Sequence, residues 1–224
     1  MKRYSILTLL AVIALGACSE LPTTSEGPAL APEATAERGA ANRAPAPSAS
    51  SITDIVIAAA GAEEAEFSLL LDAVLYIAET NPGSALIEGL FNDDQYTVFA
   101  PTDAAFGALV EAVTPLILEN DDAAEAFTAG GPFAAIDALL GDGTVEAVVS
   151  YHVTDGRRAA NSVVPPNARQ LRTITTLLDG ATFAVDSDLG ITAVGNKATI
   201  EAANISASNG IIHVIDTVLL PIEL

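Results

Sequence analysis

TVFAPTDAAF, residues 97–106, predicts a strand that runs directly into a helix. Tyr96–Ala100 is a β-type run, and Pro101 ends it because proline has no backbone N–H for a strand ladder. Thr102 and Asp103 follow, and either side chain can accept the free N–H groups of the next helix. The segment therefore places a strand and a capped helix end to end.

The chain on either side of this segment changes character. Apolar residues recur at helical spacing before and shortly after it, which predicts helices at 52–59, 66–79, 84–90, 102–110, 123–128, 133–140 and 144–151, the last capped by Thr144. The middle stretch, 115–143, is less regular. Turn-type pairs separate β-rich runs at 172–178, 181–186, 190–194, 198–203 and 211–219.

Helices followed by strands indicate an α+β domain over residues 51–224. We expect the N-terminal helices to pack on a β-sheet, or wedge, that is formed mainly by C-terminal strands. Tyr96–Ala100 is expected to join that sheet from a distance.

The first 17 residues have the features of a secretory signal peptide. Met1-Lys2-Arg3 is basic, and the uncharged run Ser5–Ala17 is shorter than the roughly 20 residues that span a bilayer. Leu15-Gly16-Ala17-Cys18 resembles a bacterial lipobox, which implies cleavage before Cys18 and lipidation of its sulfur and new amino group. The alternative is an ordinary signal peptide with an incidental cysteine. Lipidation predicts an exported protein that is anchored to the cell envelope, and Ser19 favours the outer membrane where one exists.

Residues 18–50 form the next unit. They are rich in Pro, Ala, Ser, Thr and Glu, and they lack the apolar content that a folded core needs. We predict a lipidated N-terminus followed by a disordered tether with an end-to-end distance of roughly 30 Å.

The charge and the cysteine content exclude several classes of protein. The sequence has 29 acidic and 9 basic residues, a net charge of −20 that argues against nucleic acid as a partner. With a single cysteine, the chain cannot form an intramolecular disulfide. Four arginines lie close together, and they either pair with acidic side chains or dock an anionic polymer: Arg157, Arg158, Arg169 and Arg172.

Three segments in this order resemble the conserved boxes of a fasciclin (FAS1, βig-h3-like) domain. They are TVFAPTDAAF at 97–106, YHVTDG at 151–156 and NGIIHVIDTVLLP at 209–221. The resemblance covers about 52–224 and implies the FAS1-type fold. Residues 120–142 are longer than is usual in the family, which indicates an insertion.

The resemblance implies cell–cell or cell–matrix contact, with an envelope or matrix protein or polysaccharide as partner. Binding is expected near the Tyr-His segment, at Tyr151, His152, Asp155, Arg157 and Arg158 and along the loop to Val164. A structural role is expected for Thr102, Asp103, Asn209, Gly210 and His213. The alternative function is a carrier of a small apolar ligand, such as a pigment or lipid.

The two histidines have a second interpretation. His152 and His213 can be structural, or they can form a metal or catalytic site with Asp103, Asp155 or Asp216. The sequence contains neither a G-x-S-x-G elbow nor a phosphate-binding glycine loop. We therefore predict a binding protein rather than an enzyme, with no cofactor and no metal.

Overall fold

The computed structural model describes residues 45–63, 65–92 and 94–223. Cys18, the signal peptide and most of the predicted tether lie outside the described residues. Helices come first and most strands come last, as predicted: α1 (Ile52–Ala60), α2 (Ser68–Thr80), α3 (Ala85–Phe91), β1 (Tyr96–Pro101), α4 (Asp103–Glu119), α5 (Asp121–Leu140), α6 (Thr144–Tyr151), β2 (Val153–Asp155), α7 (Ala160–Val163), β3 (Arg172–Thr175), β4 (Thr182–Val185), β5 (Gly190–Thr192), β6 (Lys197–Ala207) and β7 (Gly210–Ile215).

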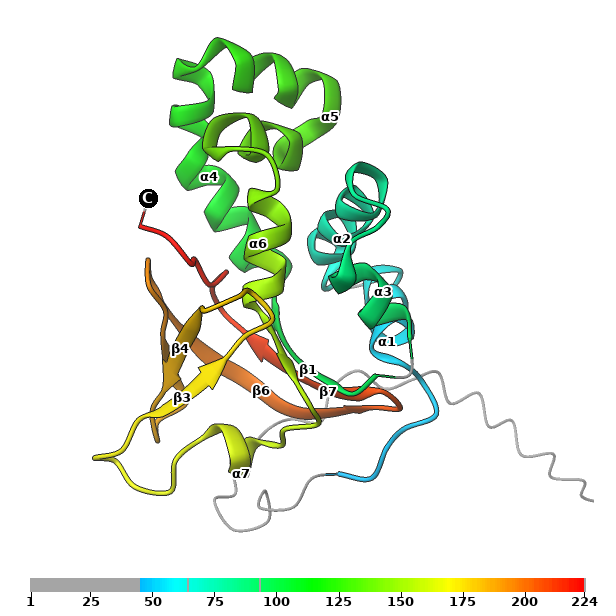
Figure 1. Cartoon of the computed structure of the whole chain (residues 1–224), viewed down its shortest axis with the longest axis vertical. Coiled ribbons are helices and arrows are strands. Elements are labelled where there is room, and N and C mark those ends of the chain that lie inside the picture. The colour runs from blue at the N-terminus through cyan, green and yellow to red at the C-terminus, as the bar shows by residue number, and fades with distance from the viewer. Residues whose placement is uncertain (1–44, 64, 93, 224) are drawn as a thin grey trace, which may run out of the picture. The chain divides into compact units, whose positions relative to one another are not determined.

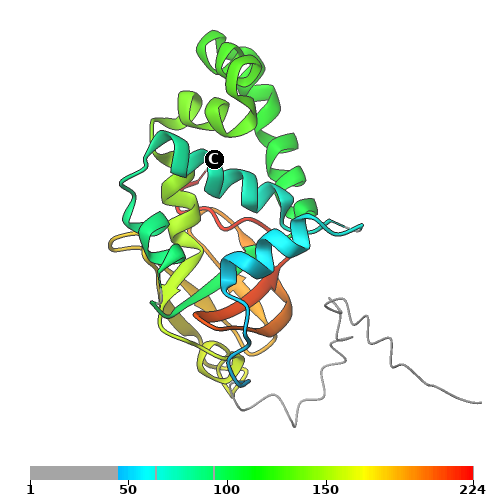
Figure 2. The ribbon, with the colours of Figure 1, turned by 90° about the vertical axis from the view of Figure 1, so that its right-hand side faces the viewer.

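The strands form one sheet in the order β2-β1-β7-β6-β5-β4-β3. β1 pairs in parallel with β7 and antiparallel with β2, which confirms that the early strand joins the C-terminal sheet. Figures 1 and 2 show that α4 and α5 lie at the end of the domain farthest from α7. Among the described residues, no helix is both long and apolar enough to cross a bilayer.

The sheet curls until its two edges meet. Thr154 on β2 donates its hydroxyl to the carbonyl of Thr175 on β3 at 2.6 Å, and Leu177 N–H donates to Val153 O at 2.8 Å. One apolar core lies inside this curl, and a second lies between the sheet and the helices. The strands β1 and β7 contribute side chains to both cores, one core on each face of the sheet. This explains why each of these two strands is mainly apolar on both of its faces.

The middle of the chain is more regular than we predicted. α4 continues through Pro115 to Glu119, because Val113 and Ile117 are buried on either side of the proline. The two short helices that we predicted are confirmed as the two segments of α5, which meet at a kink at Gly131 with φ 79° and ψ −166°. The candidate insertion 120–142 is therefore ordered and helical.

The side chains that cap the helix N-termini are only partly those that we predicted. Thr102 caps α4 and accepts from Ala105 N at 3.2 Å, but Asp103 serves α2, accepting from Leu69 N at 2.9 Å. Thr144 does not cap α6. The buried Asp137 carboxylate does so instead, by accepting from Val145 N at 2.9 Å.

The last strand is shorter than predicted. β7 ends at Ile215 rather than Leu219. Asp216 N still donates to Thr199 O on β6 at 3.1 Å, but Leu219 N turns to the His152 ring and donates to it at 2.8 Å.

Candidate functional site

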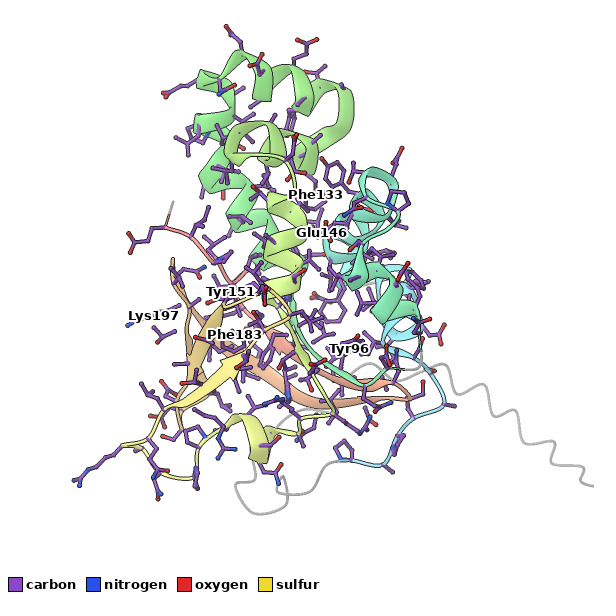
Figure 3. All side chains as sticks on the ribbon, in the orientation of Figure 1. Tyr96, Phe133, Glu146, Tyr151, Phe183 and Lys197 are labelled. Atoms are coloured by element: carbon purple, nitrogen blue, oxygen red, sulfur yellow. The ribbon has the colours of Figure 1, made fainter. Side chains whose placement is uncertain are left out.

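Tyr151 ends α6 and its side chain is fully buried. Its hydroxyl donates to Thr182 O on β4 at 2.8 Å, and its ring meets Phe183 edge-on with centroids 5.8 Å apart. Figure 3 shows the two aromatic side chains side by side beneath α6. Burial raises the pKa of the tyrosine hydroxyl. Tyr151 therefore joins α6 to the sheet and does not reach the surface.

His152 is also buried, at 3% exposure. Its Nε2 accepts from Leu219 N at 2.8 Å, so the ring proton is on Nδ1, which lies 2.7 Å from Val148 O and donates to it. Burial lowers the pKa of His152 to about 4, which keeps the ring neutral. The histidine therefore joins α6 to the C-terminal segment.

His213 on β7 makes similar contacts in the sheet core. Its Nε2 donates to Arg158 O at 3.0 Å, Asn204 N donates to its Nδ1 at 3.4 Å, and its ring stacks on Phe99 at 5.3 Å. Burial lowers its pKa as well. Both histidines bond to backbone, as the structural interpretation expects.

The carboxylates that we considered as histidine partners are bonded elsewhere or exposed. Asp103 caps α2, Asp216 accepts from Thr199 N at 2.7 Å, and Asp155 is exposed. Within the described ranges, no group of three or more His, Cys, Asp or Glu side chains is gathered to hold a metal ion.

Arg157 forms the densest hydrogen-bond cluster of the predicted site. Its guanidinium donates to the carbonyls of Ala207, Gly210 and Pro45 and, at 2.6 Å, to Ser206 Oγ. Burial lowers its pKa. The arginine thus ties the β6–β7 hairpin to the point where the chain enters the domain. Pro45 lies within the predicted tether, so part of that segment is bound to the domain.

Arg158 and Arg172 also bond to backbone carbonyls. Arg158 Nε donates to Asp155 O at 2.9 Å, and Arg172 donates to Ser162 O at 2.6 Å. Arg169 is exposed and makes no hydrogen bond to another described residue. In the described part of the chain, Arg158 and Arg172 meet carbonyl oxygens rather than carboxylates and Arg169 meets neither, so these three charges stay unpaired.

Asn209 and Gly210 have the structural role that we predicted. Asn209 Oδ1 accepts from Ile52 N at 2.8 Å, which fixes the start of α1 on the β6–β7 turn. A Cβ on Gly210 would collide with the carbonyl oxygen of Tyr96. This close approach allows β1 and β7 to begin side by side.

Two polar residues that hold the Tyr-His segment were not predicted. Thr97 Oγ1 donates to Gly156 O at 2.7 Å and accepts from Arg158 N at 2.8 Å. Asn204 has a φ of 66°, and its Oδ1 accepts from Ala160 N at 2.8 Å. An asparagine inside a β-rich run is a signal for such an irregular position.

Apolar pockets lie among the helices. One, partly open to solvent, is bounded by α4, α5, α6 and the C-terminal segment, with walls that include Phe106, Val113, Phe133, Val145 and Ile222. A second lies among α1, α2 and α3 over β1, with walls that include Val56, Leu71, Val74, Leu90 and Phe91. Both walls are almost entirely apolar.

Charge is unevenly divided between two halves of the domain. The helical half, residues 51–151, has 18 acidic residues and no lysine or arginine. The sheet half, residues 152–224, has 7 acidic and 5 basic residues. Figure 3 labels Glu146 among the helices and Lys197 at the sheet, on opposite sides of this division.

Comparison with known proteins gives a consistent set of matches. A family model described as the fasciclin domain matches residues 76–221. The chain is 32% identical to Protein sll1483 of Synechocystis over 98% of this chain and 96% of that protein. It is 30% identical to the cell surface glycolipoprotein MPB83 of Mycobacterium bovis, over 63% of this chain and 50% of that protein. A solved FAS1 domain pair from the insect cell adhesion molecule fasciclin I aligns with 66% of this chain and 44% of that chain, with a TM-score of 0.43 and 18% identity.

Proposed function

Because the chain belongs to the fasciclin family, we propose that it is a cell-surface lipoprotein whose domain binds a component of the cell envelope or extracellular matrix. Proteins of this family are cell-adhesion or surface proteins and are generally non-enzymatic. The proposed anchor is Cys18, exposed after removal of residues 1–17. The name of one relative, a cell surface glycolipoprotein, supports a lipid anchor.

The observation that carries the proposed contact surface is the division of charge. The helical half has 18 acidic residues and no basic one. The described chain begins at Pro45, which Arg157 binds, and α4 and α5 lie at the other end of the domain (Figure 1). A domain held through its N-terminus can therefore present its acidic helices away from the anchor.

A negative surface selects its partner by charge complementarity and speeds the encounter at low salt. We propose that the partner is a protein with a basic surface or a polysaccharide with amine groups. Exposed apolar side chains on α4 and α5, Leu116, Leu118 and Phe127, add area to the same surface.

A pull-down of envelope fractions tests this proposal. The variant Glu111→Gln, Glu119→Gln, Glu125→Gln removes three exposed carboxylates from the helices. The control Asp179→Asn, Asp188→Asn, Glu201→Gln removes three exposed carboxylates from the sheet half. We expect the helical variant to lose at least about tenfold in affinity, which corresponds to about 1.4 kcal/mol, and the control to bind like wild type.

Equal binding by both variants would contradict the helical surface. Absence of a bound partner at low and at moderate salt would contradict the adhesion proposal itself. Mass spectrometry of the N-terminal peptide tests the anchor separately, since acylated Cys18 has a defined mass.

The direct binding role predicted for the Tyr-His segment remains a proposal. Tyr151 and His152 are buried, and the guanidinium of Arg157 is held by four hydrogen bonds. Asp155 and Arg158 are therefore the members that a partner can touch most readily. Asp155→Asn with Arg158→Gln keeps the buried pair intact and tests this surface in the same pull-down. Unchanged binding would exclude it.

The two apolar pockets favour a second function, the transport of a small apolar ligand. Leu109 and Val74 are partly exposed, and each lines one pocket. Solvent extraction of natively purified protein followed by mass spectrometry identifies a bound lipid or pigment. If the first pocket holds the ligand, Leu109→Trp should abolish ligand binding, and if the second pocket holds it, Val74→Trp should do so. Natively purified wild-type protein without a bound ligand would contradict this function.

A further inference from the structure

We propose that the loop between α7 and β3, residues 164–171, docks the domain on a phospholipid surface. In this arrangement Leu171 inserts at the level of the headgroups, and Arg169 and Arg172 face lipid phosphates. The proposal rests on the proposed lipid anchor, because the anchor brings the domain to the membrane.

The first observation is a basic segment on an acidic protein. Residues 156–178 contain four arginines and no acidic residue. Arg158 and Arg172 bond to backbone carbonyls, and Arg169 makes no bond to a described residue. Because no carboxylate of residues 45–63, 65–92 or 94–223 pairs with these groups, their charge is available to phosphate, which guanidinium groups bind in a bidentate fork.

The second observation is an apolar side chain presented at the same place. Leu171 lies between the two arginines and is 68% exposed, and the five residues before it are also exposed. Gln170 N donates to Asn167 O at 3.0 Å, which closes a turn just before the leucine. An exposed leucine flanked by arginines matches the boundary between acyl chains and headgroups.

The third observation is the position of the loop relative to the anchor. Arg157 binds Pro45, and Arg172 binds Ser162 O in α7. Figures 1 and 2 show α7 at the end of the domain where the described chain begins. Residues 19–44 separate Cys18 from Pro45, and 26 residues can extend to at most roughly 90 Å. The loop and the lipid can therefore reach one membrane together.

The negative charge of the helices does not oppose this arrangement. Screening limits electrostatic repulsion to about 8 Å at physiological salt, and α4 and α5 lie at the far end of the domain. Repulsion from anionic lipid instead favours the orientation in which the acidic helices point outward. An anionic polysaccharide could also attract the arginines, but it offers no apolar phase to Leu171.

The chain contains no tryptophan, so a single reporter is unambiguous. The test uses the lipidated full chain in vesicles of phosphatidylethanolamine and phosphatidylglycerol with brominated acyl chains. In Leu171→Trp we expect a blue-shifted emission that the bromines quench several-fold. The matched control is Leu118→Trp on α4, where the native leucine is 72% exposed; its emission should be neither shifted nor quenched.

Adding Arg169→Gln to the Leu171→Trp variant should weaken the quenching. Equal quenching of the two single reporters would overturn the proposal. So would a Leu171→Trp reporter that responds to dextran sulfate but not to vesicles, because that result assigns the loop to a polyanion.

The Cys18→Ala chain distinguishes failure of this proposal from failure of the anchor. Without acylation, we expect the Leu171→Trp reporter to respond to the same vesicles with an affinity weaker by on the order of 100-fold. If mass spectrometry finds no lipid on wild-type Cys18 but the reporter is still quenched, the anchor fails and the docking loop stands. If Cys18 is acylated and the reporter is not quenched, the docking loop fails.

Discussion

The helical half and the sheet half use their polar residues in different ways. The helical half has 18 acidic residues and no basic one, and many of these carboxylates lie on exposed helix faces. The sheet half uses polar side chains to hold loops in place: His152, His213, Arg157 and Asn209 all bond to backbone atoms. The segment that resembles a binding motif is therefore largely structural, while the acidic helices offer a free surface.

The largest expected effect tests the structural role of the Tyr-His segment. Tyr151→Ala should lower the free energy of unfolding by about 3–5 kcal/mol, because it leaves a cavity in the sheet core. Tyr151→Phe removes only the bond to Thr182 and should cost about 1 kcal/mol. Urea denaturation measures both. An alanine variant with wild-type stability and impaired partner binding would make Tyr151 a contact residue instead.

The next effect is the pH dependence that the buried histidines impose. The folded-state pKa of His152 is about 4, below the value of about 6.5 in an unfolded chain. The unfolded state therefore gains a proton first as the pH falls. The contribution to stability is complete above about pH 6.5, and up to about 3 kcal/mol is lost as the pH falls toward 4.

NMR of the histidine rings checks this pH dependence directly, since the chain has two histidines. His213 shifts in the same direction and adds to the loss of stability. The His152 ring should not titrate between pH 7.5 and pH 6. A histidine that titrates near pH 6.5 would mean that its ring is hydrated, contrary to the structure.

A smaller effect is expected where the chain enters the domain. Arg157→Met removes the hydrogen bonds to the β6–β7 hairpin and to Pro45, and it should cost about 1–3 kcal/mol. Cleavage by proteases should increase within residues 45–50. Arg169→Met is the matched control and should stay within about 0.5 kcal/mol of wild type. An equal decrease in the free energy of unfolding of both variants would show that the positive charge, rather than these hydrogen bonds, stabilises the region.

The smallest effect concerns repulsion among the helical carboxylates. Raising the salt concentration should stabilise the domain, since like charges on helices cost about 0.2–0.5 kcal/mol per close pair. The variant Glu111→Gln, Glu119→Gln, Glu125→Gln should gain less from salt than wild type. Thermal unfolding at several salt concentrations measures the gain, and the sheet-half variant Asp179→Asn, Asp188→Asn, Glu201→Gln should behave like wild type.

Local sequence patterns gave the order of elements, the Thr102 cap and the turn at Asn209-Gly210. They did not give the role of Asp103, because its acceptor oxygens serve α2, about 35 residues earlier in the sequence. They did give the two helical segments of α5 on either side of Gly131, but they missed the continuation of α4 through Pro115 to Glu119. The partners of Arg157 are carbonyls from distant segments, and no local pattern encodes them.

The central claim is that the acidic helices face outward while the sheet half lies toward the membrane. Ala129→Cys on α5 and Ala168→Cys in the docking loop are matched probes, since both alanines are exposed. The measurement is their labelling by a membrane-impermeant maleimide on intact membranes that carry the lipidated protein. The account predicts rapid labelling at position 129 and slow labelling at position 168, with equal rates once detergent releases the protein. Equal rates on the membrane, or faster labelling at position 168, would contradict it.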